Sequence, residues 1–139
     1  MAGASSAQMA YRTLARTELR NERVPAAALA HVLAAVGTAD RAIVARDLMA
    51  ANGRLIEAQQ VMTLLRNALD HRADAGLSAN LERLYNYVIA ELARANLEKS
   101  RTRLAALVMV LTPLHDAWQR AADTVLRGSE ARAAGGVVA

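Results

Sequence analysis

The side chains that most often carry catalysis or hold a metal are few in this chain and far apart. The chain has three histidines and no cysteine. The absence of cysteine removes disulfides, thiolate nucleophiles and cysteine-based zinc sites together. His31, His71 and His115 fall on three different expected elements, and no His-Glu-x-x-His motif places two ligands on one helix face. We therefore expect no catalytic centre, no metal and no cofactor.

Two histidines have an aspartate beside them in the sequence, in Asp70-His71 and His115-Asp116. Adjacent residues on a helix point in different directions, so we interpret both pairs as surface residues and not as acid–base pairs. The chain also contains no glycine-rich phosphate loop and no dinucleotide-binding motif. The sequence therefore predicts that the protein is not an enzyme.

The charge of the chain raises nucleic-acid binding as an alternative. The formal net charge is +4 and the pI is near 10.3. Lys99 is the only lysine, and the arginines are dispersed along the sequence. Residues 1–24 hold four arginines and two glutamates, so they supply +2, half of the excess. Such dispersed charges are typical of solvated faces, and we expect no nucleic-acid partner.

The composition favours a small helical protein. The 139 residues suffice for one domain, 54% of them are hydrophobic, and phenylalanine is absent. Alanine has the highest helix propensity, while the residues that suit a sheet are sparse. The longest apolar run, Leu104–Leu111, has eight residues, fewer than the ~20 that a membrane-spanning helix needs. Residues 1–10 lack a basic start followed by an apolar run, so no signal peptide is expected. We predict a soluble, all-α protein.

Apolar periodicity divides the chain into an arm, four helices and a tail. Pro25 suits the first turn of a helix, and Asn52-Gly53 is a favoured helix end. Ser78 and Ser100 are expected N-caps, and Pro113 is expected to bend or break the last helix. Short loops predict antiparallel neighbours. The expected elements are a flexible N-terminal arm (1–23), a four-helix bundle (24–127) with helices over 25–52, 54–70 and 79–98 and from Ser100, and a disordered tail (128–139).

One stretch of the third expected helix resembles a known family. Leu84-Tyr85-Asn86-Tyr87-Val88 is followed by Ala95-Asn96-Leu97. Downstream lie Leu111, Leu114 and Asp116-Ala117-Trp118. These residues resemble the signature of the FliS family of flagellin export chaperones. The resemblance covers about Tyr11 to Ala122 and is strongest from residue 80 onward.

The first long helix departs from the family pattern. Family members usually carry Ser-Pro, then Leu-Ile, then an aromatic residue followed by Asp-Gly. This chain has Val24-Pro25, Leu29 and then Ala34-Ala35-Val36-Gly37. If this helix forms part of a partner groove, the choice of partner or the affinity is altered.

The resemblance implies an antiparallel four-helix bundle that holds the C-terminal segment of flagellin in the cytoplasm, prevents premature polymerisation and delivers the client to the flagellar export machinery. An export gate is a further partner that it suggests. An amphipathic segment of the client would fold as a helix into apolar grooves of the bundle. The implied mechanism is stoichiometric binding and release.

Several residues are candidates for contact with this client. Tyr85 and Tyr87 point roughly 200° apart on a helix, so both cannot face the core. The amide of Asn96 either bonds the client backbone or closes the helix end. Tyr11 is a candidate for tying down the arm, which would occupy the groove until the client displaces it. Trp118 is expected in the core, and the aliphatic candidates are either core or groove. The complete set of candidates is Tyr11, Leu29, Leu33, Val36, Tyr85, Tyr87, Ile89, Leu92 and Asn96.

Two other functions remain open from the sequence. The first is a structural or dimerising bundle without an export client, in which a face such as Ala26-Ala27-Ala28 mediates self-association, so a homodimer is one of the states considered. The second is the basic nucleic-acid binder, which would show steep salt dependence.

Overall fold

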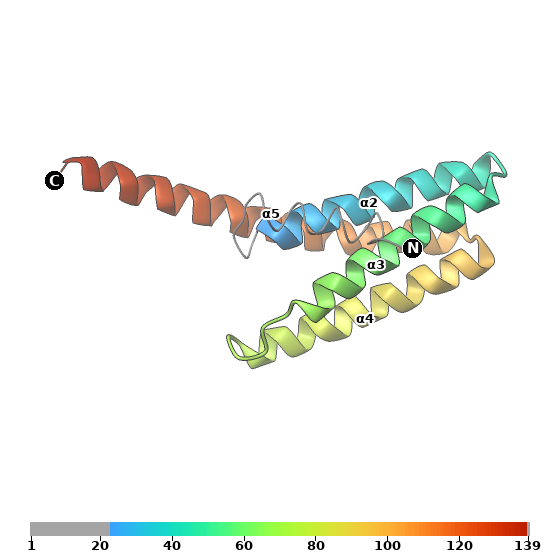
Figure 1. The fold of residues 1–139 in the computed structure, drawn as a ribbon, viewed down its shortest axis with the longest axis horizontal. Coiled ribbons are helices and arrows are strands. Elements are labelled where there is room, and N and C mark those ends of the chain that lie inside the picture. The colour runs from blue at the N-terminus through green and yellow to red at the C-terminus, as the bar shows by residue number, and fades with distance from the viewer. Residues whose placement is uncertain (1–22, 139) are drawn as a thin grey trace, which may run out of the picture.

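The computed structural model describes residues 23–138, and the side chains of residues 24–135. This part of the chain forms four helices and no strand: α2 (Arg23–Val44), α3 (Leu48–Asn67), α4 (Ala75–Glu98) and α5 (Arg101–Val138). Successive helices run in opposite directions (Figure 1). The prediction of an antiparallel, all-α four-helix bundle is confirmed. The N-terminal arm expected over residues 1–23, with Tyr11, lies outside the described residues apart from the first residue of α2.

The helices form a closed ring. α2 packs against α3 and α5, and α4 packs against the same two helices. The seam between α2 and α5 is therefore opposite the seam between α3 and α4. Towards the α3–α4 loop, α3 and α4 diverge from the other pair (Figure 1).

The core is built from small aliphatic side chains, with one aromatic residue fully buried among them. Each helix contributes an apolar stripe at the three- and four-residue spacing of a bundle seam. Burial of these stripes supplies the main driving force for folding. Trp118 is partly buried and packs against the core, as expected. The largest fully buried side chains are Leu29, Val32, Val36, Leu55, Val61, Met62, Tyr85, Val88, Leu92, Leu104, Leu107 and Leu111.

The turn after α2 comes earlier than the sequence predicts. Asn52-Gly53 lies inside α3, and α2 ends where the Asp47 amide bonds the Ala42 carbonyl (2.8 Å) and the Arg46 amide bonds the Ile43 carbonyl (3.0 Å). This is a Schellman motif, and Arg46 takes the left-handed conformation (φ 62°) that glycine usually supplies. The predicted end at Asn52-Gly53 was wrong because an arginine makes the turn.

The turn after α4 repeats this arrangement. The Ser100 amide bonds the Ala95 carbonyl (3.0 Å), and Lys99 is left-handed (φ 50°). In both turns the next residue caps the following helix. The side chain of Asp47 accepts from the amide of Ala50 (3.1 Å), and the hydroxyl of Ser100 accepts from the amide of Arg103 (3.1 Å). The predicted N-cap at Ser100 is confirmed.

The start of α4 differs from the expected one. Asp74 is the N-cap and accepts from the amide of Leu77 (3.0 Å). Ser78 is buried inside α4, where its hydroxyl donates to the carbonyl of Asp70 (2.9 Å). Both residues are good caps, and Asp74 precedes a helical first turn, so the predicted cap at Ser78 was wrong.

The last helix is continuous through Pro113 and extends beyond the bundle (Figure 1). Pro113 and Met109, whose carbonyl loses its helical partner, both lie on the exposed face of α5, where water can bond that carbonyl. The helix therefore is not interrupted. The structure also keeps residues 128–138 helical where a disordered tail was expected, although the segment holds three glycines, which have low helix propensity.

α2 is the one described helix that is long and apolar enough to cross a membrane, by length and composition alone. Polar residues divide it into apolar runs that are all shorter than Leu104–Leu111. Its larger apolar side chains Leu29, Val32 and Val36 are buried in the bundle. A core helix of a soluble protein passes the same test, and we assign no membrane role to α2.

The paired turns generate a stability prediction. Replacing the capping side chain in Asp47→Ala or Ser100→Ala leaves a backbone amide unpaired, and we expect each change to lower the free energy of unfolding by about 1 kcal/mol. Urea unfolding followed by circular dichroism measures the change. Thr102→Ala, on an exposed residue of the first turn of α5, is the control. A loss no larger than that of the control would contradict the capping roles.

Candidate functional site

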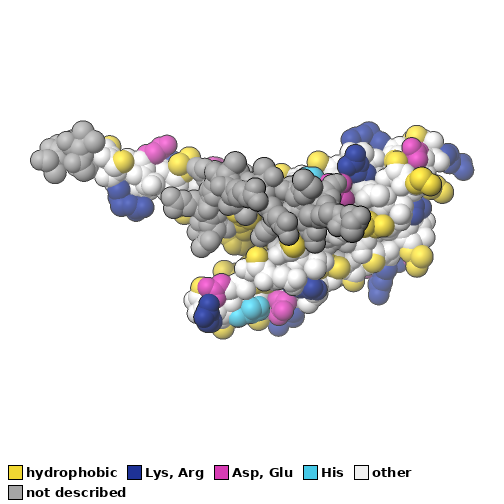
Figure 2. All heavy atoms as spheres, viewed as in Figure 1, with side chains coloured by type: hydrophobic (Ala, Val, Ile, Leu, Met, Phe, Trp, Pro, Cys, Tyr) yellow, Lys and Arg dark blue, Asp and Glu magenta, His cyan; other side chains and the backbone are white. Residues whose placement is uncertain are grey.

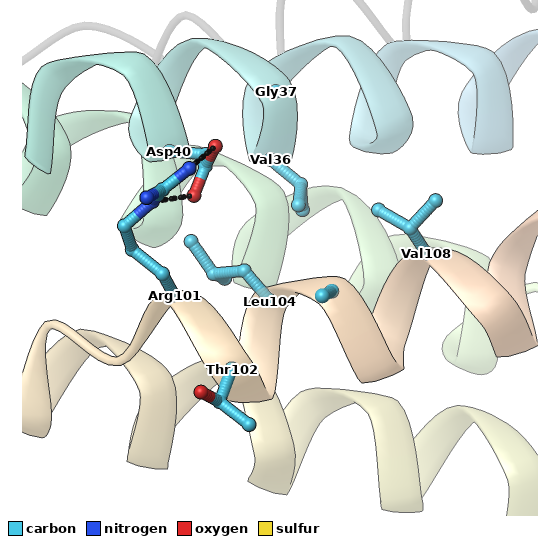
Figure 3. A pocket seen from close by; sticks show the side chains of 8 residues that line it. Val36, Gly37, Asp40, Arg101, Thr102, Leu104 and Val108 are labelled. Atoms are coloured by element: carbon cyan, nitrogen blue, oxygen red, sulfur yellow. Dashed lines mark hydrogen bonds and ion pairs between the residues drawn. The ribbon is translucent and has the colours of Figure 1, made fainter. Parts of the chain in front are cut away.

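The bundle carries a groove of about 370 Å³ along the seam between α2 and α5. Val36 and Leu104 point towards each other across the groove, and Val108 continues its apolar wall (Figure 3). Gly37 lies on α2 beside them and contributes no side chain. A Cβ at this position would approach the guanidinium of Arg41 at 3.5 Å, an ordinary contact. Packing therefore does not require glycine there, and its absence of a side chain leaves the groove open.

An ion pair closes one end of this α2–α5 groove. Arg101 donates from Nε to Oδ1 of Asp40 (2.8 Å) and from Nη2 to Oδ2 (3.2 Å), a two-bond arrangement (Figure 3). These hydrogen bonds lower the pKa of Asp40, against the opposing effect of its partial burial. Asp40 thus lies at the edge of the apolar stripe of α2. The groove is apolar along its length and charged at one end.

A second groove, of about 450 Å³, lies between α3 and α4. Ile56 and Leu64 of α3 and Ile89 of α4 give it apolar contact area. Amide and hydroxyl side chains between them offer both hydrogen-bond donors and acceptors. These polar lining residues are Gln59, Gln60, Thr63 and Asn67. Because the α3–α4 seam is opposite the α2–α5 seam, the two grooves lie on opposite sides of the ring.

The predicted aliphatic contact residues divide between the grooves and the core. Val36 lines the α2–α5 groove and Ile89 lines the α3–α4 groove. Leu29 and Leu92 are fully buried. Leu33 is partly buried and packs against the core. Tyr11 lies outside the described residues.

The two tyrosines of α4 face opposite sides, as their spacing predicts. Tyr85 is 1% exposed and belongs to the core, whereas Tyr87 is 50% exposed. Of the pair, Tyr87 is therefore the one with a ring that another molecule can reach in this conformation.

Asn96 joins two helices. Its amide donates to the side-chain oxygen of Asn52 on α3 (2.9 Å), and its own oxygen accepts from Nζ of Lys99 (2.9 Å). Asn96 is only 9% exposed. In this conformation its side chain is engaged within the bundle, which corresponds to the helix-end alternative considered from the sequence.

Other contacts were missed by the sequence analysis. Nε2 of His31 lies 2.5 Å from a carboxylate oxygen of Glu57, which joins α2 to α3. Nδ1 of His115 contacts Asp116 at 3.1 Å, although neighbouring residues were expected to point apart. Both side chains are long enough to turn back across the helix surface.

In the described part of the chain, no group of three or more His, Cys, Asp or Glu side chains is placed to hold a metal ion.

Several groove residues were also not predicted. Gly37, Leu104, Val108 and Ile56 line the grooves, but apolar periodicity assigns such residues only to a helix face. Which part of that face remains open depends on the neighbouring helix. A weak signal existed for Gly37, because a glycine inside a helix lowers stability unless it serves another purpose.

The sequence profile of the family described as flagellar protein FliS matches residues 4–125. The chain belongs to the FliS family. No curated protein matches the sequence closely enough to count as a relative. FliS proteins are soluble cytoplasmic chaperones of flagellar biogenesis and export. The resemblance seen in the sequence is thereby confirmed, and it extends through the divergent first helix of the bundle.

The Asp40–Arg101 ion pair of this FliS protein leads to a prediction of how stability depends on pH. Because the pKa of Asp40 is lowered in the folded state, its contribution to stability is complete above its unfolded pKa of about 4 and is lost as the pH falls through the folded pKa. We expect Asp40→Asn to destabilise the protein at pH 7 and to differ less from the parent as the pH falls below about 4. Urea midpoints across this range measure the difference.

Glu82→Gln is the control, because no ion pair of Glu82 is present among the described residues. A constant difference between Asp40→Asn and the parent at every pH would show that the Asp40 charge does not contribute through this pair.

Proposed function

We propose that this FliS protein binds the C-terminal segment of flagellin in the cytoplasm, prevents its premature polymerisation and delivers it to the export machinery. The observation that carries the proposal is the family match over residues 4–125. Two open grooves on opposite sides of the bundle, one mainly apolar and one mixed, support it, because a disordered client can lie in both when it wraps around the bundle.

The energetics suit a client that folds as it binds. Ordering a disordered segment costs about 2–5 kcal/mol of the gross interaction energy. A single groove buries few side chains, so one groove alone offsets little of this cost. Occupation of two grooves by one segment adds the apolar burial of both, and the linkage makes the second contact intramolecular.

The α2–α5 groove suits an apolar side chain of the client. The exposed Val108 supplies aliphatic contact above a floor formed by the buried Val36 and Leu104, and the open space beside Gly37 admits a branched side chain. The Asp40–Arg101 pair at its end offers charged groups to client polar groups. This is the place where the chain departs from the usual family motif, so we propose that Gly37 and Val36 adapt this groove to its own flagellin.

The α3–α4 groove suits a client helix that carries both apolar and polar residues. Ile56 and Ile89 provide apolar contact. Gln59, Gln60 and Asn67 can bond backbone groups at the ends of a client helix, where four amides and four carbonyls lack partners. We propose that Tyr87 contacts the client outside the groove, from its exposed position on α4.

Other residues that the sequence predicts to contact the client remain proposals. Tyr11 is proposed to hold the N-terminal arm near the client site. Leu29, Leu33, Tyr85 and Leu92 would act on the client by supporting the helices that carry the grooves, since all four are buried or partly buried. An export gate is the proposed receiver of the client.

The proposal is tested by calorimetric titration with the last ~40 residues of the host's flagellin, a length that can wrap a bundle. We expect one-to-one binding with a strongly negative heat-capacity change and a gain in helix, because apolar surface is buried as the segment folds. Duplex DNA at two salt concentrations is the control for basic binding. Absence of binding by a folded protein would contradict the proposal, as would equal affinity for the DNA.

The role of the first groove is tested at Gly37. Gly37→Leu places a side chain in the α2–α5 groove, and we expect flagellin affinity to fall about tenfold, because one apolar contact is displaced. Gly37→Ala is the matched control. It is expected to raise stability by up to about 1 kcal/mol through helix propensity and to leave affinity nearly unchanged. If Gly37→Leu binds as tightly as Gly37→Ala, the client does not use this groove.

A further inference from the structure

The corner between α2 and α3 exposes apolar side chains that the core does not use. We define the α2–α3 corner as Arg41, Val44, Arg46, Leu48 and Met49. Val44 is 58% exposed, Leu48 48% and Met49 84%. None of the three lines either groove. At the end of the bundle that carries this turn, hydrophobic and basic side chains lie side by side (Figure 2).

The two arginines of the corner form no contact ion pair among the described residues, although the charge of Arg41 acts on the nearby carboxylate of Asp40. In the described part of the chain, Arg41 donates only to the hydroxyl of Thr38, and Arg46 forms no side-chain hydrogen bond or ion pair. The carboxylate of Asp47 caps α3. The other carboxylates at this end are in ion pairs with Arg94, Arg101 and Arg103; they are Asp40, Glu91 and Glu98.

Arg46 has a backbone conformation that favours glycine. Its φ of 62° is left-handed, a conformation that costs a side-chain-bearing residue roughly 1–2 kcal/mol and glycine almost nothing. Lys99 at the matching turn bonds the carbonyl and side chain of Asn96, so its side chain has a structural use. The side chain of Arg46 has no such use among the described residues.

We propose that the α2–α3 corner is a docking surface for an acidic segment of a partner protein, separate from the client grooves. Carboxylates of the partner would pair with Arg41 and Arg46, and an apolar residue would pack on Met49 and Leu48. Arginine and methionine are enriched at protein interfaces. The hydrogen-bonded turn holds these side chains on a preorganised backbone, which reduces the entropic cost of binding.

Charge favours an acidic segment as the occupant of the corner over a second copy of the chain or an anionic membrane surface. A second copy of the chain would bring the same arginines against one another, and like charges disfavour that contact. An anionic membrane surface contributes only about 1 kcal/mol for each basic residue, and the corner offers two arginines, with Asp47 directly after Arg46. An acidic peptide can instead place its carboxylates at the arginines and away from Asp47.

The proposal is tested with the full chain and a labelled amphipathic peptide of leucine and glutamate, about 16 residues or four helical turns long. A matched peptide with lysine in place of glutamate is the charge control. We expect the acidic peptide alone to bind, with amide NMR shifts changing over residues 41–49. Arg46→Gly is expected to weaken this binding about two- to fivefold while raising the urea midpoint, because glycine relieves the left-handed strain.

Arg46→Lys keeps the charge and is expected to retain most of the binding, and Arg127→Gln, an exposed cation on the far part of α5, is expected to change nothing. All three variants are expected to bind flagellin peptide like the parent, so failure here is separate from failure of the chaperone proposal. The proposal is overturned if the lysine peptide binds as tightly as the acidic peptide, or if the NMR shift changes lie in the grooves. It is also overturned if flagellin peptide displaces the acidic peptide, or if Arg46→Gly changes stability but not the affinity for the acidic peptide. Binding to phosphatidylserine vesicles that depends on Arg46 and Met49 would assign the corner to a lipid surface instead.

Discussion

Burial of one apolar stripe from each helix at the centre of the ring is the constraint on which the rest of the structure depends. The stripes are made mainly of alanine, leucine and valine, and Tyr85 is the only aromatic side chain fully buried in the described core. Small side chains allow helices to approach closely, since the interior must be filled without voids. The α2–α5 groove lies over part of these stripes, since the buried Val36 and Leu104 also form its floor. Partly covered apolar side chains, such as Val108 in this groove and Ile56 in the α3–α4 groove, lie beside the buried ones.

The two grooves follow from the same packing but differ in chemistry. The α2–α5 groove is aliphatic with an ion pair at one end, whereas the α3–α4 groove alternates apolar residues with amides. A client that occupied both grooves would be recognised by apolar contact in the α2–α5 groove and by hydrogen bonds in the α3–α4 groove. Packing does not require the opening beside Gly37, because a Cβ at this position would make only an ordinary contact. Because this groove lies on the divergent first helix, we propose that the open space beside Gly37 contributes to the choice of client.

In the α2–α3 and α4–α5 turns, at one end of the bundle, consecutive residues end one helix and cap the next. Arg46 and Lys99 end one helix, and Asp47 and Ser100 begin the next. Such tight connections set the antiparallel pairing of α2 with α3 and of α4 with α5. They also place basic side chains at helix C-termini, where the helix dipole favours positive charge. Stability alone would favour glycine at the left-handed positions, and the side chain kept at Lys99 is explained by its bonds to Asn96.

The sequence by itself determined the helical class, the antiparallel bundle and the family, because apolar periodicity and the Tyr85–Leu97 signature are local properties of the chain. It also determined that Tyr85 and Tyr87 face apart, since helix geometry sets the angle between them. It did not determine which of the two is buried, where α2 ends, or that Asn96 bonds Asn52. These depend on neighbours far away in sequence. Asn52-Gly53 remained helical because the turn was already made at Arg46 and because Asn52 pairs with α4. Only the tertiary structure decided which apolar residues line grooves, since a leucine such as Leu92 becomes core and an isoleucine such as Ile89 becomes groove according to the helix that packs beside it.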